Sequence, residues 1–246
     1  MSAAQVLVFK NSKLYWGPND WSGQTNDASI EFGVEELPKH ASGDGTKIIH
    51  PGLMNVSAKM GAFWQAQLTP VGIEKLVFAG IGDEGDAPFT LAPVAGADGE
   101  AALTFRAGLV SDPTSAQHGQ LARVEAAFAA RASRLVDGTI LADAVNRVAT
   151  GNGVARQLGA ASALKRLYVA MHVLAFVGTT LTLKVQSDDN SGMTTPVDRV
   201  TSSAFTTVGS AWAELDGPIT DDWWRATWTF TGTSFTALLV AGILNK

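Results

Sequence analysis

The chain has 246 residues, of which 46% are hydrophobic and 17% are charged, and it contains no cysteine. This balance supports well-packed cores and argues against an intrinsically disordered chain, a disulfide framework and a thiolate metal site. The formal net charge is −5, without a cluster of lysines and arginines, so we expect no electrostatic affinity for nucleic acid backbones or anionic membranes.

The N-terminal residues Met1 to Gln5 lack the basic and apolar regions of a signal peptide. No apolar run reaches the ~18–20 residues that cross a bilayer. We therefore expect a protein that is made in a cytoplasm and has no membrane partner. The length allows one large β domain or two domains of ~100–150 residues.

Short segments with a β pattern recur along the first half of the chain, separated by turn residues, which is typical of a sandwich or barrel. Ile30, Phe32 and Val34 alternate with more polar residues, so one face of this strand should be buried and the other solvated. Residues 40–45 are rich in Gly, Ser and Asp and indicate a loop. The other strands expected in this half are Gln5 to Phe9, Lys13 to Trp16, Lys47 to Leu53 and Val56 to Leu68.

Helix signals are scarce. The best is Thr69 to Phe78, where Thr69 can cap and Pro70 occupies the first helical position. The segment Gln120 to Arg131 is ambiguous: its alanines favour a helix, while Val124, Ala126, Phe128 and Ala130 alternate with more polar neighbours, as in a strand.

Residues 144–153 are small and show no sustained period, so we place a domain boundary there, between a first domain of residues 1–146 and a second of residues 147–246. The second domain should be an antiparallel β-sandwich. Asp221 to Thr236 is predicted to be a β-hairpin that turns at Gly232. The strands expected in this domain are Leu167 to Val177, Leu181 to Ser187, Ala204 to Val208, Trp223 to Thr231 and Phe235 to Ile243.

Two motifs suggest ligands, but a simpler interpretation competes with each. Gly80 to Gly85 has the dinucleotide-binding spacing G-x-G-x-x-G; however, the expected helix precedes it, and Asp83 and Glu84 would repel phosphate, so a loop is favoured. Asp188 to Gly192 is rich in oxygen atoms, which leaves a Ca²⁺ site open, although a tight turn explains the same residues.

No catalytic constellation is visible. The four histidines are scattered, and His172 lies in an apolar strand, where a core residue with satisfied hydrogen bonds is expected. There is no nucleophile elbow, no Walker loop and no evident acid–base pair, so we expect neither an enzyme nor a cofactor or metal.

The tryptophans near the C-terminus divide between two faces of one strand. Trp224 and Trp228 share a face that should belong to the core. Trp223 and Arg225 share the other face and are candidates for an exposed contact with a subunit or a glycan.

Several segments together resemble the tail tube (major tail) proteins of long, non-contractile-tailed bacteriophages. They are Gln5 to Asn11, Gly43 to Leu53, Val56 to Gln65, Ala102 to Leu109 and Arg134 to Leu141. Residues 185–192, 217–225 and 232–235 are similar to C-terminal β domains that are appended to some phage structural proteins.

The resemblance implies a tail-tube-like β-barrel or sandwich with one short helix, in which residues 121–131 are extended. It also implies subunits that form stacked hexameric rings in the virion tail, assembled in the host cytoplasm with other tail proteins, around a channel through which DNA passes without sequence-specific binding. A head decoration or capsid-associated protein and a glycan- or receptor-binding module are the alternatives. The expected assembly loop comprises Ala41, Ser42, Gly43, Asp44 and Gly45.

Overall fold

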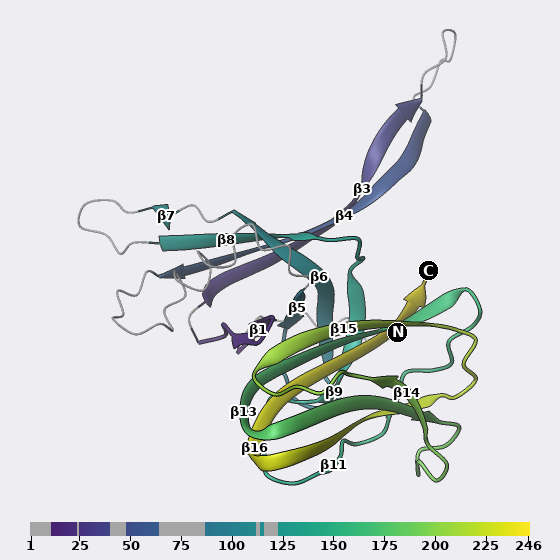
Figure 1. Cartoon of the computed structure of the whole chain (residues 1–246). Coiled ribbons are helices and arrows are strands. Elements are labelled where there is room, and N and C mark those ends of the chain that lie inside the picture. Colours follow the sequence, from purple (N-terminus) through teal and green to yellow (C-terminus); the bar gives the residue numbers. More distant parts are fainter. Residues whose placement is uncertain (1–10, 24, 40–47, 64–86, 112–113, 116–122) are drawn as a thin grey trace. The chain divides into compact units, whose positions relative to one another are not determined.

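The computed structural model describes residues 11–23, 25–39, 48–63, 87–111, 114–115 and 123–246 (Figure 1). These residues form antiparallel β-strands and contain no helix, which confirms the expected mainly-β class. In this part of the chain, no helix that could span a membrane is found. The expected helix at Thr69 to Phe78, the strand at Gln5 to Phe9 and the glycine motif at residues 80–85 lie outside the described residues.

The chain forms two compact units. Unit 1 comprises residues 1–23, 86–105 and 136–246, and unit 2 comprises residues 24–85 and 106–135. The expected boundary after residue 146 therefore lies inside unit 1. The reason is that the segment after it pairs with strand β16 (Trp223–Asn245) through three short strands instead of forming a linker. These are β10 (Asn146–Arg147), β11 (Gly151–Asn152) and β12 (Arg156–Gln157).

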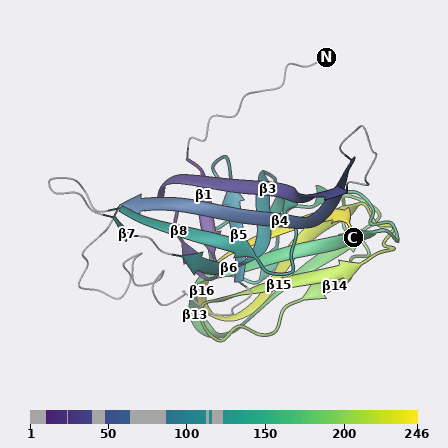
Figure 2. The same cartoon turned by 90° about the horizontal axis from the view of Figure 1, so that it is seen from above.

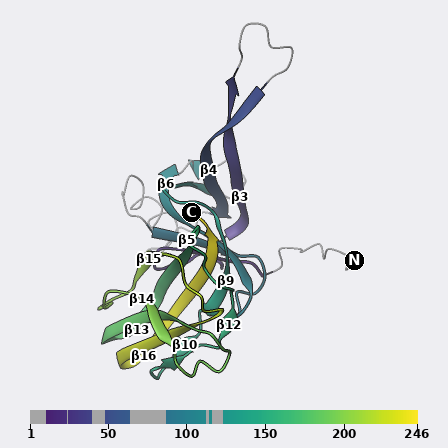
Figure 3. The same cartoon turned by 90° about the vertical axis from the view of Figure 1, so that its right-hand side faces the viewer.

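Unit 1 is built on the pairing of two long strands, β13 (Lys165–Asp188) and β16, which lie side by side in Figure 3. Their register runs from Lys165 opposite Asn245 to Asp188 opposite Trp223. The β-hairpin expected at Asp221 to Thr236 is wrong, because β16 continues through Gly232. The two strands expected on either side of Gly178 are likewise one strand.

Both long strands bend where two glycines face each other. Gly178 is opposite Gly232, and the register shifts on either side of Gly178. A Cβ on Gly232 would lie 2.5 Å from the Gly178 Cα and 2.5 Å from the Val177 carbonyl oxygen. The absence of side chains here lets the backbones approach, and residues from both halves of each strand then share one core. This core includes Leu167, Val169, Met171, Leu181, Leu183, Val185, Trp224, Trp228, Phe235 and Leu239.

Further strands extend this sheet on both sides. β14 (Val197–Thr201) pairs with the second half of β13, and β15 (Gly209–Asp216) pairs with the first half. The strand expected at Ala204 to Val208 is thus displaced, and Phe205 makes only an isolated bridge to Leu181. On the other side of β16 the order is β9 (Val136–Ala142), β6 (Ala101–Ser111), β5 (Ala87–Ala92), β1 (Lys13–Trp16) and β2 (Asn19–Asp20).

Arg147 holds the segment that was expected to be a linker against β16. Its guanidinium donates hydrogen bonds to the carbonyl oxygens of Asp143 (2.8 Å), Val145 (3.1 Å) and Ala237 (3.2 Å). It also forms an ion pair with the Asp143 carboxylate and lies 4.6 Å from the centre of the Trp228 ring. The hydrogen bonds from one terminal nitrogen to three carbonyl oxygens, the ion pair and the cation–π contact together hold this segment of small residues against β16.

Unit 2 is a smaller antiparallel sheet. β3 (Thr25–Lys39) pairs with β4 (Ile48–Phe63), β4 pairs with β8 (Arg123–Ala130), and β8 pairs with residues 107–111 of β6 and with β7 (Thr114–Ser115). The ambiguous segment at residues 120–131 is therefore a strand where it is described. Val124, Ala126 and Phe128 are buried, so the alternation of side chains outweighs the helix propensity of alanine.

A buried polar network crosses unit 1 and confirms His172 as a core histidine. The His172 Nδ1 atom lies 2.7 Å from the Gly17 carbonyl oxygen, to which it donates, and Nε2 lies 2.9 Å from Thr90 Oγ1. Thr90 is in turn 2.9 Å from Thr104 Oγ1, which donates to the Phe89 carbonyl oxygen. Burial lowers the pKa of His172 to about 4, so the imidazole is neutral in the folded protein near pH 7.

We predict that Gly232→Ala lowers the free energy of unfolding of unit 1 by about 1–3 kcal/mol, because its Cβ would collide with backbone atoms that cannot move aside. Gly23→Ala is the control, since no heavy atom lies within 4 Å of its added Cβ. It should change stability by about 0.5 kcal/mol or less. Urea denaturation followed by tryptophan fluorescence measures both. Equal urea denaturation midpoints for the two variants would refute the close approach of the backbones at Gly178 and Gly232.

We also predict that the stability of unit 1 falls as the pH falls from about 6.5 toward about 4. In this window the unfolded chain takes up a proton at His172 that the folded chain does not, so the loss approaches about 1.4 kcal/mol per pH unit. His172→Gln removes this proton uptake and should flatten the dependence. Urea denaturation between pH 7 and pH 4.5 compares the two slopes, and identical slopes would contradict the prediction.

Candidate assembly interface

The structure describes only some of the residues expected to form an interface. The expected assembly loop, Ala41 to Gly45, lies outside the described residues. Trp223 and Arg225 are described, and they share the solvent-facing side of β16 in unit 1, while Trp224 and Trp228 are buried in the core as expected. An additional candidate, which the sequence did not single out, is strand β3 in unit 2.

Strand β3 forms an edge of the described sheet of unit 2. It pairs with β4, and no other described strand pairs with it (Figure 2). The register is regular from Ala28 opposite Met60 to Val34 opposite Met54, between shifts at Thr25/Asp27 and Val34/Glu36. Residues 28–34 contain neither lysine nor proline. A regular edge without such blocking residues is a template for pairing with another strand.

One face of β3 and β4 carries an apolar stripe that runs from the core to the open edge. In the interior, Val56 is 0% exposed, and Ala58 and Met60 are also buried. Phe32, which pairs with Val56, is 55% exposed, and Val34 is 43% exposed. Met54, opposite Val34, is 41% exposed. An exposed stripe that continues a core marks a surface suited to a further partner.

The opposite face of the same strands is polar and carries mixed charge. A surface hollow of about 470 Å³ lies over this face. Asp27 at its rim forms an ion pair of 3.4 Å with Arg123 on β8. The hollow is lined by Asp27, Ala28, Ser29, Lys59, Met60, Gly61, Glu125, Ala126 and Ala127. Both signs of charge are present, so the hollow has no strong preference for a cation or an anion.

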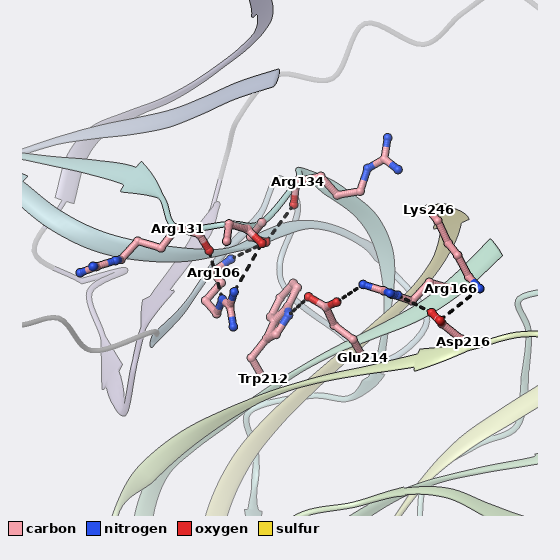
Figure 4. A network of polar contacts seen from close by, with 10 residues as sticks. Arg106, Arg131, Arg134, Arg166, Trp212, Glu214, Asp216 and Lys246 are labelled. Atoms are coloured by element: carbon pink, nitrogen blue, oxygen red, sulfur yellow. Dashed lines mark hydrogen bonds and ion pairs between the residues drawn. The ribbon is translucent and has the colours of Figure 1, made fainter. Parts of the chain in front are cut away.

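Each unit also contains a cluster of polar contacts, drawn in Figure 4. In unit 2, Arg106 donates from Nε to the Arg131 carbonyl oxygen at 3.1 Å and from a terminal nitrogen to that of Ala132. In unit 1, Arg166 bridges Glu214 and Asp216. The same carboxylates accept from the Trp212 indole and from Lys246. The Arg106 contacts hold the backbone of residues 131–132, and the Arg166 contacts hold β15 against β13.

The loop at Asp188 to Gly192 is a turn. The Asp188 carboxylate accepts hydrogen bonds from the backbone nitrogens of Thr195 (2.7 Å) and Asn190 (3.2 Å) and from the Asn190 side-chain amide (3.0 Å). These donors occupy both carboxylate oxygens in the way an Asx-turn requires. Among the described residues, no group of three or more His, Asp or Glu side chains could hold a metal ion.

Comparisons with known proteins give distant structural similarities. Neither a scan against protein-family models nor a search of curated proteins finds a match. The chain is similar to the Dit protein of phage SPP1, described as a paradigm of the hub adsorption apparatus in phages that infect Gram-positive bacteria. The TM-score is 0.42 at 11% identity, over 96% of this chain and 100% of that one. It is also similar to a chain in the virion of a native gene transfer agent, with a TM-score of 0.34 at 15% identity, over 46% and 84% of the two chains.

We predict that Phe32 contributes little to the folding of unit 2, whereas its neighbour Val56 contributes much. Phe32→Ala should lower the free energy of unfolding by about 1 kcal/mol or less, because more than half of the side chain is already exposed. Val56→Ala should cost about 2 kcal/mol, because its methyl groups leave a cavity. Chemical denaturation at low protein concentration, where copies do not associate, measures both. A larger loss for Phe32→Ala would place this side chain in the core.

Proposed function

We propose that the protein is a structural component of a bacteriophage tail that assembles with copies of itself into rings, which stack into a tube. The observation that carries the proposal is the open edge of β3 with its exposed apolar stripe. Backbone groups along residues 28–34 can form a ladder with a strand of the next copy, and Phe32, Val34 and Met54 can be buried in the same step.

Pairing of this kind is compatible with a ring. When the β3 edge of one copy pairs with a different surface of the next, the contact is head-to-tail, and successive contacts of this kind close into a ring if the rotation allows. An antiparallel edge gains stability from both backbone hydrogen bonds and cross-strand side-chain pairs. We propose six copies for each ring, on the basis of the resemblance of the sequence to tail tube proteins.

The polar face of the same sheet suits the wall of a DNA conduit. It combines Asp27, Glu31 and Glu125 with Lys59 and therefore has no basic surplus that would hold a phosphate backbone. DNA would pass without sequence-specific contacts. We assign the protein a structural rather than an enzymatic role, located in the virion after assembly in the host cytoplasm, with other tail proteins as partners.

The test compares assembly of the wild-type chain with that of an edge variant. Phe32→Lys combined with Val34→Lys places two charges in the stripe and should abolish rings and tubes, because burying them unpaired costs more than the edge pairing gains. The control is Val154→Lys, which changes a valine of similar exposure in unit 1 and should assemble normally. Negative-stain microscopy and analytical ultracentrifugation at high concentration measure the outcome.

Circular dichroism tests whether the variants keep their β structure, which separates a loss of assembly from a loss of folding. A wild-type chain that stays monomeric at high concentration would refute self-assembly. Normal tubes from the doubly charged variant would refute the assignment of the β3 edge.

A further inference from the structure

The outer face of one part of unit 1 is a closed, polar surface. In this part β13 lies between β14 and β16, and β16 lies between β13 and the short strands β11 and β12. Lys184, Gln186 and Arg225 project from this face, while the alternate residues Leu183, Val185, Trp224 and Ala226 are buried beneath it. A peptide cannot add a strand here, because each long strand already has two neighbours.

A chain of hydrogen bonds on this face orients Arg225. Lys184 Nζ and Gln186 Nε2 each donate to the Asp198 carboxylate at 2.6 Å. This fixes the Gln186 amide so that its Oε1 atom faces Arg225 and accepts from Nε at 2.9 Å. Arg225 is half-buried, so its guanidinium is held in place before any ligand arrives.

The charge of Arg225 is left without a partner. Asp198 is paired with Lys184, and Gln186 is neutral. Within the part of the chain that the structure describes, the two terminal nitrogens of Arg225 have no hydrogen-bond acceptor and no carboxylate forms an ion pair with them. A guanidinium that offers two parallel N–H donors in this way matches the geometry of a carboxylate.

An aromatic ring and polar side chains share this face with Arg225. Trp223 precedes Arg225 by two residues and therefore lies on the same face of β16, half-buried. Gln157 lies opposite Trp223 on β12, and Asn152 lies opposite Thr227 on β11; both are exposed. Indole rings stack against the C–H faces of sugar rings, and amides bond to their hydroxyl groups.

We propose that this face binds an acidic saccharide, with the sugar carboxylate on Arg225 and the sugar ring on Trp223. The inference is independent of self-assembly, because it rests on unit 1 alone and on residues that the β3 edge does not include. The hydroxyl groups of a neutral sugar could accept from Arg225 but would supply no counter-charge, so their hydrogen bonds would be weaker. A poly-glutamate peptide has no ring to stack on Trp223, and it cannot add a strand to β13 or β16, because each has two neighbouring strands in this part of unit 1.

The experiment titrates the full chain with three probes by isothermal calorimetry and ligand-observed NMR. The probes are oligogalacturonate, the neutral oligogalactan of equal length, and a poly-glutamate peptide of equal charge. Oligogalacturonate should bind at least about tenfold more tightly than either of the others, the difference expected when a charged hydrogen-bonded pair is formed. Equal binding of poly-glutamate would overturn the proposal in favour of a general carboxylate site, and no binding of oligogalacturonate would also overturn it.

Variants of Arg225 and Trp223 test whether these two residues bind oligogalacturonate. Arg225→Gln should weaken oligogalacturonate binding about tenfold or more, and Arg225→Lys, which keeps the charge but loses the fork, should not restore it fully. Trp223→Ala should weaken binding, and Trp223→Phe should retain most of it. Arg123→Gln, an exposed arginine of unit 2, is the matched control and should bind as the wild type does. Thermal denaturation confirms folding of each variant, and undiminished binding by folded Arg225→Gln would refute the site.

Discussion

The pairing of β13 with β16 is the constraint on which unit 1 depends. These strands are paired along almost their whole lengths, although residues 189–222 separate them in the sequence. Because a twisted ribbon of this length cannot enclose a core while it stays straight, it must bend, and the facing glycines Gly178 and Gly232 supply the space. Strands β14 and β15 pair with β13 and strands β9 to β12 pair with β16, while β6, β5, β1 and β2 follow in order beyond β9.

Segments that are distant in sequence are then tied to the ribbon by polar groups. His172 on β13 donates from Nδ1 to the Gly17 carbonyl oxygen and accepts at Nε2 from the Thr90 hydroxyl, and Arg147 donates to the carbonyl oxygen of Ala237 on β16. Such contacts cost desolvation energy, which is recovered only when every donor and acceptor is correctly placed. They therefore favour a single arrangement of the strands over the many that a hydrophobic core alone would permit.

The two units differ in the groups that they leave available to a partner. In the part of unit 1 around Arg225, β13 and β16 are flanked on both sides, so a ligand can use only side chains. In unit 2, β3 offers backbone groups and apolar side chains together. A surface built from side chains suits a small ligand, and an open edge suits another strand. The same β architecture thus supports both the assembly and the saccharide site proposed for this chain.

The sequence by itself determined the β class and the burial of Trp224 and Trp228 and favoured the turn after Asp188, because these depend on alternation and turn chemistry within a few residues. At residues 120–131 the alternation and the alanine propensity pointed in opposite directions, and the pairing of β8 with β4 and β6 decided for a strand. Only the tertiary structure decided that β16 passes through Gly232 without turning, that residues 146–157 form short strands along β16 rather than a linker, and that β3 pairs on one side only among the described strands. A local pattern fixes which face of a strand is apolar, but the identity of its neighbour depends on residues far along the chain.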